Sequence, residues 1–538
     1  METLHLETPV KSCKEKVRAS LVFGISLCAA VGLFAKLANL AAGSEWSEPA
    51  GLFLAKGATS PAPLLGDGTA VDWWFAFKPT TDAFPECSTK ITCMFGGSTE
   101  SYKGWGLQYV LSHGTKGQTS AMQLHSDCLG NGDDPVAKTF AQVYSGSAPN
   151  YVIWNDQFYD DPELNIQPPC VKYCAGPWGH SKGVMAWDED GTGFIMQVTT
   201  PDWPGTGSAS KPRSTQGNTL GCVKDDNIKV AQHFFALRLA TLDDTRTVLQ
   251  ALQRASVATD PSNDQLVKLT SGPAELSSLA KQLGRQVLDN LTPFSETLSV
   301  KTTSQVRLIA KPSGLHVPPW LMVSSLLGAP LRTASWWGKP EINSTKAGFV
   351  PGCWNKTLQA PKEVQVALSG QFGGKTFSLE GHPTTNGNHA KLAHSLSGSK
   401  LTILADMNQQ GSLNGNAGGE DSCEISQNGR GGLFFVVEDD VLHTGMSELL
   451  KGATADYAGG SPGPSPSPGP GPSPSPGPSP GPSPAGSCGG SGVSWSTCKS
   501  RSGCTYVHKE DAKSCGVEGY GCYAPSSLSA ACPKSMWA

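Results

Sequence analysis

A run of 24 residues near the C-terminus limits what this chain can fold into. The run "SPGPSPSPGPGPSPSPGPSPGPSP", residues 461–484, has proline at every second position. Proline lacks the backbone N–H that helices and central strands use, so this run cannot belong to a packed core. It is typical of an extended polyproline II rod, roughly 75 Å long at about 3.1 Å per residue. We therefore expect separately folded parts on either side of it.

Composition divides the 538 residues into four parts. We expect a leader, a body, a Pro/Ser/Gly-rich linker and a cysteine-rich module, at residues 1–43, 44–457, 458–486 and 487–538. The body is long enough for two halves, which we place at about 44–270 and 271–457. Only 16% of the residues are charged and the net charge is −4. This balance argues against a simple nucleic-acid-binding protein, but it allows an enzyme that meets DNA in a small cationic cleft.

The first 43 residues have the pattern of a secretory leader. Basic residues from Lys11 to Arg18 precede the apolar run 19–35, and the small residues "AAGS" at 41–44 suit signal peptidase. We interpret the segment as a signal peptide that directs the protein into the secretory pathway, towards a lysosome or vacuole or the extracellular space. The alternative is an uncleaved signal anchor, because such an apolar run nearly spans a bilayer.

The cysteines agree with an oxidising compartment. Fourteen of the 16 lie outside the leader, eight between Cys87 and Cys423 and six between Cys488 and Cys532. An even number in a secreted chain predicts disulfide bonds, and six within 487–538 predict a three-disulfide module whose connectivity stays open. Three sequons would be glycosylated in a secreted eukaryotic protein: Asn290, Asn343 and Asn355.

Strand and helix patterns alternate in the body, which favours an α/β fold. Apolar and aromatic runs predict strands at 70–79, 106–113 and 150–158. Apolar residues at helical spacing predict helices at 243–256, 274–291 and 446–457.

The body contains the pair His-x-Lys twice. His180 and Lys182 open "GHSKGVMAWDEDGTGFIMQVTT", and His389 and Lys391 open "NHAKLAHSLSGSKLTILADMN". Each pair is followed by a strand, a turn, a second strand and a polar end, so each opens an apparent hairpin. The two halves therefore look like two copies of one supersecondary unit.

The spacing within each pair has a chemical consequence. Residues two apart in a strand point to the same face, so each histidine should project together with its lysine. If the copies meet about a pseudo-two-fold axis, two imidazoles and two ammonium groups converge. This set suits a phosphate diester, because the lysines can hold non-bridging oxygens while one histidine attacks phosphorus and the other protonates the leaving oxygen. No metal or other cofactor is required, and the sequence does not choose the attacking histidine.

Polar residues near the strand ends are candidates for supporting roles. Thr199 ends the first apparent hairpin, and Asp406 and Asn408 end the second, where we expect them to orient His389 or the phosphate. Asn155, with Asp156 beside it, either supports the site or caps a turn.

Three further residues are weaker candidates for the site. Arg430, in "GRGG", is a lesser candidate for contacting the phosphate backbone. Cys170 and Cys174 could bind a metal together with His180, but disulfide bonding is favoured in a secreted chain.

The paired arrangement resembles the phospholipase D superfamily, whose catalytic pairs are His-x-Lys from each half. Over about residues 70–452 the chain is more closely similar to the deoxyribonuclease II family. The similarity rests on six stretches in order: "VDWWFAFKPT" (71–80), "YVIWNDQ" (151–157), "GHSKGVMAWDEDGTGFIMQVTTPDWP" (179–204), "NHAKLAHS" (388–395), "ADMNQQ" (405–410) and "GRGGLFF" (429–435). The family usually reads "DHSKWC" where this chain has "NHAKLA".

This resemblance implies a phospholipase D-like α/β fold with two pseudo-symmetric halves, mixed β-sheets and flanking helices. It implies an acid endonuclease that hydrolyses DNA phosphodiester bonds without a metal and leaves 3′-phosphate ends. DNA is then the expected substrate, and the oligomeric state, monomer or homodimer, stays open.

Two other classes of function remain. A phospholipase D-like phosphodiesterase acting on lipids would share the four residues, although the local matches do not follow that group's "HxKxxxxD" pattern. A catalytically inactive extracellular-matrix glycoprotein is suggested by the rod, which resembles the Ser-Pro rods of green-algal wall and matrix proteins. That alternative does not explain the paired hairpins. The cysteine-rich module is a candidate for binding a wall or matrix ligand.

Overall fold

The protein is described from a computed structural model, in which the chain divides into two compact units, Met1–Gly460 and Ser461–Ala538. The described residues of the first unit are 60–80, 108–115, 117–125, 129, 133–158, 164–170, 173–201, 203–205, 230–299, 304–381, 386–415 and 421–458. Those of the second are 490–491, 505–507, 517, 521–523 and 528. The predicted leader and rod lie outside these ranges. Within them, no helix has the length and apolar character needed to cross a membrane.

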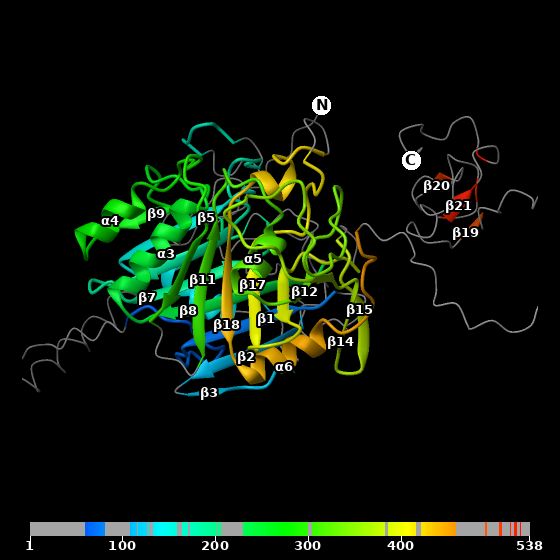
Figure 1. Cartoon of the computed structure of the whole chain (residues 1–538). Helices are drawn as coiled ribbons and strands as arrows, with labels where there is room; N and C mark the ends of the chain where they lie inside the picture. The colour runs from blue at the N-terminus through cyan, green and yellow to red at the C-terminus, as the bar shows by residue number, and fades with distance from the viewer. Residues whose placement is uncertain are drawn as a thin grey trace, which may run out of the picture. The chain divides into compact units, whose positions relative to one another are not determined.

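A nine-stranded sheet is built from the first half of the body (Figure 1). Its strand order is β3-β2-β1-β8-β7-β6-β5-β9, with β4 paired to β2, and all of its described ladders are antiparallel. The strands are β1 Trp73–Lys78, β2 Tyr109–Thr115, β3 Gln118–Thr119, β4 Gln123–His125, β5 Asn150–Asn155, β6 Lys182–Trp187, β7 Gly193–Val198, β8 Gln232–Leu239 and β9 Val267–Leu269. The strands predicted at 70–79, 106–113 and 150–158 are confirmed as β1, β2 and β5.

A seven-stranded sheet is built from the second half, in the order β10-β11-β18-β17-β16-β12-β13. It is mixed, because β12 pairs with β13 in parallel and with β16 in antiparallel orientation. Its strands are β10 Phe294–Leu298, β11 Gln305–Lys311, β12 Leu331–Ala334, β13 Val364–Val366, β16 Leu392–Ser395, β17 Leu401–Ala405 and β18 Gly432–Glu438. A separate hairpin joins β14 Ser369–Phe372 to β15 Lys375–Ser378. The fold is thus α/β with sheets that dominate over helices.

Five neighbouring strands have the same arrangement in both sheets. The order β1-β8-β7-β6-β5 corresponds to β11-β18-β17-β16-β12, and every pairing within both sets is antiparallel. The two apparent hairpins that follow the His-x-Lys pairs are confirmed as β6–β7 and β16–β17. The first turns through Asp188–Gly191, where Gly191 has φ +81°, a conformation that favours glycine.

Within the described ranges the α-helices are short: α2 Pro135–Tyr144, α3 Leu242–Arg254, α4 Ala274–Ala280, α5 Pro319–Leu327 and α6 Asp440–Leu449. The helix predicted at 243–256 is confirmed as α3, which begins with a capping box between Thr241 and Asp244.

Two helix predictions are wrong in their extent. The helix predicted at 274–291 ends at Ala280, since Gly284 adopts φ +70° against the Thr259 carbonyl. The helix predicted at 446–457 is α6, which begins six residues earlier at Asp440 and ends at Leu449. After it the chain extends along residues 366–368 and forms backbone hydrogen bonds with them.

The two sheets share one apolar core. Phe235 of β8 packs on Phe435 of β18 with ring centroids 5.5 Å apart, and α3 contacts strands of both sheets. This packing brings the chain segments before β6 and β16 close to strands of the opposite sheet. The second unit, described by itself, contains a three-stranded sheet of Gly490–Ser491, Gly521–Tyr523 and Thr505–Val507.

Candidate active site

The two predicted histidines lie just before strands, not on them. Strand β6 begins at Lys182 and β16 begins at Leu392, so the strand geometry from which we predicted that each histidine projects with its lysine does not extend to the histidines. The reason is tertiary, because the segment before each strand bonds to the other half. The backbone N–H of His180 donates to the Gly431 carbonyl, and that of His389 donates to the Ala231 carbonyl, both at 2.8 Å.

Each imidazole is held by a backbone carbonyl of the opposite half. His180 Nδ1 lies 2.7 Å from the Asp406 carbonyl oxygen, and His389 Nδ1 lies 2.7 Å from that of Thr199. A carbonyl oxygen can only accept, so Nδ1 must carry the proton. In each neutral ring Nε2 then keeps its lone pair, which leaves two oriented nitrogens available as base or nucleophile.

The two lysines are bound differently. Lys182 Nζ forms an ion pair with Asp156 Oδ1 at 2.5 Å. Lys391 Nζ donates to the backbone carbonyl of His389 at 2.5 Å, and the Lys391 backbone N–H donates to His233 Nδ1 at 3.2 Å. The charge of the first lysine is therefore neutralised by a carboxylate, whereas the second lysine donates its hydrogen bonds to uncharged acceptors.

The four side chains form one buried electrostatic cluster. Burial lowers the pKa of His180 well below its usual value, and the Lys182 charge lowers it further. Burial also lowers the pKa of His389 well below its usual value, with Lys391 and Lys182 adding to the shift. The pKa of Lys391 is lowered by burial and then by Lys182. Because each half influences the other, the fold brings all four predicted residues together.

Asp156 joins Lys182 to a second buried cation. Its Oδ2 accepts from Arg430 Nη2 at 2.7 Å. Burial alone would raise the pKa of Asp156, but Lys182 and Arg430 hold it below its usual value. We expected Asp156 either to support the site or to cap a turn, and the contacts show the former.

Arg430 stabilises the segment that leads to His180. Its guanidinium donates to the carbonyls of Trp178, Cys174 and Gly179 as well as to Asp156. These hydrogen bonds direct the guanidinium into the protein. Arg430 is therefore not positioned as the contact to the DNA phosphate backbone that the sequence suggested.

Asp406 and Thr199 have corresponding positions after β17 and β7. The Asp406 carboxylate accepts from the Leu433 N–H at 3.2 Å, and burial raises its pKa to about 7. Thr199 Oγ1 accepts from the His233 N–H at 2.9 Å. We expected Asp406 to orient His389 or the phosphate. Its carbonyl holds His180 instead, while His389 is held by the Thr199 carbonyl, and a role of Asp406 towards the phosphate stays a prediction.

Asn155 and Asn408 do not bond to the four central side chains. Asn155 Oδ1 accepts from the Gln157 N–H at 2.8 Å, which caps a turn after β5. Asn408 Nδ2 donates to Gln410 Oε1 at 2.8 Å. Both side chains are buried nearby, and each keeps one polar atom without a protein partner among the described residues.

Trp336 is a neighbour of the site that was not predicted from the sequence. Its indole meets the His389 imidazole edge to face, with ring centroids 5.3 Å apart and planes at 81°. It follows β12 much as Asp156 follows β5. Strand β12 pairs with β16 as β5 pairs with β6. Aligning the two halves on these strands could therefore have identified Trp336 as the counterpart of Asp156.

Four cysteines of the body form disulfides and are separate from the four central side chains. Cys170 and Cys174 form a disulfide, as favoured from the sequence, and Cys353 pairs with Cys423. No group of three or more His, Cys, Asp or Glu side chains suited to a metal occurs in the described ranges.

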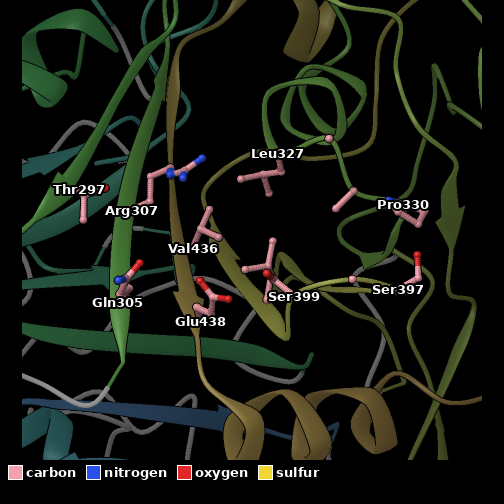
Figure 2. Close-up of a pocket in the computed structure, with 13 residues that line it drawn as sticks. Thr297, Gln305, Arg307, Leu327, Pro330, Ser397, Ser399, Val436 and Glu438 are labelled. Carbon is pink, nitrogen blue, oxygen red and sulfur yellow. The ribbon is translucent and has the colours of Figure 1, made fainter.

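A pocket of about 270 Å³ lies on the seven-stranded sheet (Figure 2). Arg307 of β11 and Glu438 of β18 are among the residues that line it, and none of the predicted site residues lines it.

A family model described as deoxyribonuclease II matches residues 64–429, which is more than half of the chain and includes all four central side chains. No curated protein matches the chain.

Proposed function

The chain belongs to the deoxyribonuclease II family, and we propose that it is an acid endonuclease that cuts DNA without a metal and leaves 3′-phosphate ends. The observation that carries this proposal is the reciprocal attachment of the two histidines. His180 bonds to the Asp406 carbonyl and His389 to the Thr199 carbonyl, each across to the other half. The same contacts, with the matching order of five strands, support a phospholipase D-like pseudo-two-fold arrangement of the halves.

The proposed reaction has two displacement steps. Nε2 of one histidine attacks phosphorus, the P–O5′ bond breaks, and the other histidine, protonated, gives its proton to the departing 5′-oxygen. The product is a phosphohistidine whose phosphorus stays bonded to the 3′-oxygen of the upstream fragment, and the downstream fragment leaves with a free 5′-hydroxyl. A water molecule, deprotonated by the second histidine, then attacks phosphorus, so the P–N bond breaks and a 3′-phosphate leaves. Both histidines return to their starting protonation states.

The lysines supply the positive charge that this reaction needs. Lys182 and Lys391 are buried beside the histidines, where fixed charges stabilise an anionic transition state more than they would in water. Asp156 and Arg430 keep Lys182 in place. The phosphate itself offsets the repulsion between the two ammonium groups once it is bound.

We expect plasmid DNA to be cleaved in excess EDTA, because the two lysines take the place of metal cations around phosphorus. The measurement is conversion of supercoiled plasmid, followed by identification of the new ends as 3′-phosphates through their dependence on phosphatase for primer extension. Activity that disappears on chelation and returns with magnesium would contradict the four-residue mechanism. Phosphatidylcholine is assayed in parallel, and hydrolysis of the lipid alone would favour the lipid phosphodiesterase.

We expect kcat/KM to peak at acidic pH and to decline below neutrality. One histidine must be neutral to attack and the other must be protonated to release the 5′-oxygen. Because burial and the lysines lower the pKa of both rings, the acid loses its proton as the pH rises towards about 6.5, the ordinary histidine value. The pair titrates as one unit, which predicts a bell whose centre lies below about pH 6.5. The profile is measured on a short duplex at constant ionic strength, and a steady rise to pH 8 would exclude a histidine acid.

We also propose that the protein passes through the secretory pathway. The disulfides Cys170–Cys174 and Cys353–Cys423 support this, since such bonds persist in oxidising compartments. The apolar run that would be the signal lies outside the described residues.

A further inference from the structure

Trp336 places an aromatic surface beside one of the two histidines. We propose that its indole stacks on one of the two nucleobases that flank the scissile phosphate, and so forms a base-binding subsite. This inference rests on the proposed nuclease function, because it concerns the position of the DNA strand in that same site.

The indole connects the buried site to the surface. His389 is only 6% exposed, whereas Trp336, in edge-to-face contact with it, is partly exposed. A nucleotide whose phosphate reaches the buried histidines must place its sugar and base outside them, beside this ring. An aromatic ring binds any of the four bases, since every base has a π-face.

The loop that carries Trp336 is firmly braced. The Ser335 hydroxyl accepts from the Gln409 N–H at 2.8 Å, and the Pro340 carbonyl accepts from the Gly411 N–H at 2.9 Å. The Trp337 indole donates to the Ile342 carbonyl at 3.0 Å, which closes the loop on itself. Trp336 is thus held near its base-binding position before DNA arrives. Binding therefore adds little conformational-entropy cost for ordering this side chain.

The corresponding place in the other half has a different chemistry. There Asp156 follows β5, is 1% exposed, and is bound by Lys182 and Arg430. One side of the scissile phosphate is therefore charged and closed, and the other is aromatic and partly open. Base stacking is consequently expected on the His389 side alone, and a base must leave the duplex stack to reach it.

The test is a thermodynamic cycle between one side chain and one base. The substrate is a single-stranded oligonucleotide with one phosphodiester, its other linkages being methylphosphonates. Two further substrates replace the base on the 5′ or the 3′ side of that phosphate with a tetrahydrofuran abasic residue. The kcat/KM of each is measured for the wild-type chain and for Trp336→Ala, Trp336→Leu and Trp336→Phe, with circular dichroism to confirm folding. Trp354→Phe is the matched control, because Trp354 is a partly exposed tryptophan of the same half whose indole N–H has no hydrogen-bond partner among the described residues.

We expect one abasic position to cost the wild-type enzyme about tenfold in kcat/KM, within the range of base–aromatic stacking. The same abasic replacement should lower the kcat/KM of Trp336→Ala and Trp336→Leu by less than about twofold. In these variants the base has no aromatic ring to stack on, so its removal costs no stacking. Trp336→Phe and the control Trp354→Phe should retain most of the discrimination.

Equal abasic effects in wild type and both non-aromatic variants, at both positions, would overturn the inference. A shifted pH profile with no such coupling would mean that Trp336 only tunes His389, which overturns it as well. Failure of the wild-type chain to cut any DNA would be a different result, since it rejects the proposed nuclease function and the subsite with it.

Discussion

Replacing either His180 or His389 with alanine is expected to lower DNA turnover by about a thousandfold or more, because each step of the proposed reaction uses both rings. Each variant should still fold. The lost side-chain hydrogen bond, to the Asp406 or the Thr199 carbonyl, is worth only about 1 kcal/mol. The measurement is kcat on a labelled oligonucleotide, with circular dichroism and urea unfolding as checks on the fold.

The double variant is expected to be little worse than either single one, since nucleophile and acid act as one unit. His316→Ala is the matched control, because His316 is partly exposed and its ion-pair partner is Glu424 at 3.9 Å. A single variant that keeps more than about a tenth of the activity would remove that histidine from the mechanism, since acid–base catalysis alone contributes at least about a hundredfold.

Asp156→Ala is expected to destabilise the body by about 3–5 kcal/mol, because it leaves two buried cations, Lys182 and Arg430, without their carboxylate. Such a loss is a large fraction of a typical folding free energy. It should also lower kcat, since Lys182 loses the group that positions it. The midpoint of urea unfolding and the kcat of the folded fraction measure the two effects. Asp156→Asn, which keeps the shape of the side chain, separates charge from packing.

Glu275→Ala provides the matched control for this ion pair. It removes a carboxylate from the partly exposed Arg246, which also contacts Asp243, and surface pairs of this kind contribute little. An Asp156→Ala protein whose unfolding midpoint equals that of Glu275→Ala would show that the buried pair does not stabilise the fold.

Local pattern was enough to predict the two central hairpins. The apolar runs that became β6–β7 and β16–β17 lie next to each other in sequence, and Gly191 marks the first turn. The same kind of pattern failed for α4, where nothing near Ala280 in sequence shows that Gly284 packs on the Thr259 carbonyl. Periodicity identifies an element, but contacts from elsewhere decide where it ends.

The sequence by itself determined the four central side chains and the family, because each His-x-Lys pair and the stretches around it are contiguous and can be read directly. Only the tertiary structure decided how these residues are held. His180 and Asp406 are 226 residues apart, and Arg430 and Asp156 are 274 apart. Trp336 likewise meets His389 only because β12 lies beside β16. Such contacts depend on how the two sheets pack face to face and on which strand ends then lie next to each other. A sequence pattern extends over only a few residues, so it carries no information about these long-range contacts.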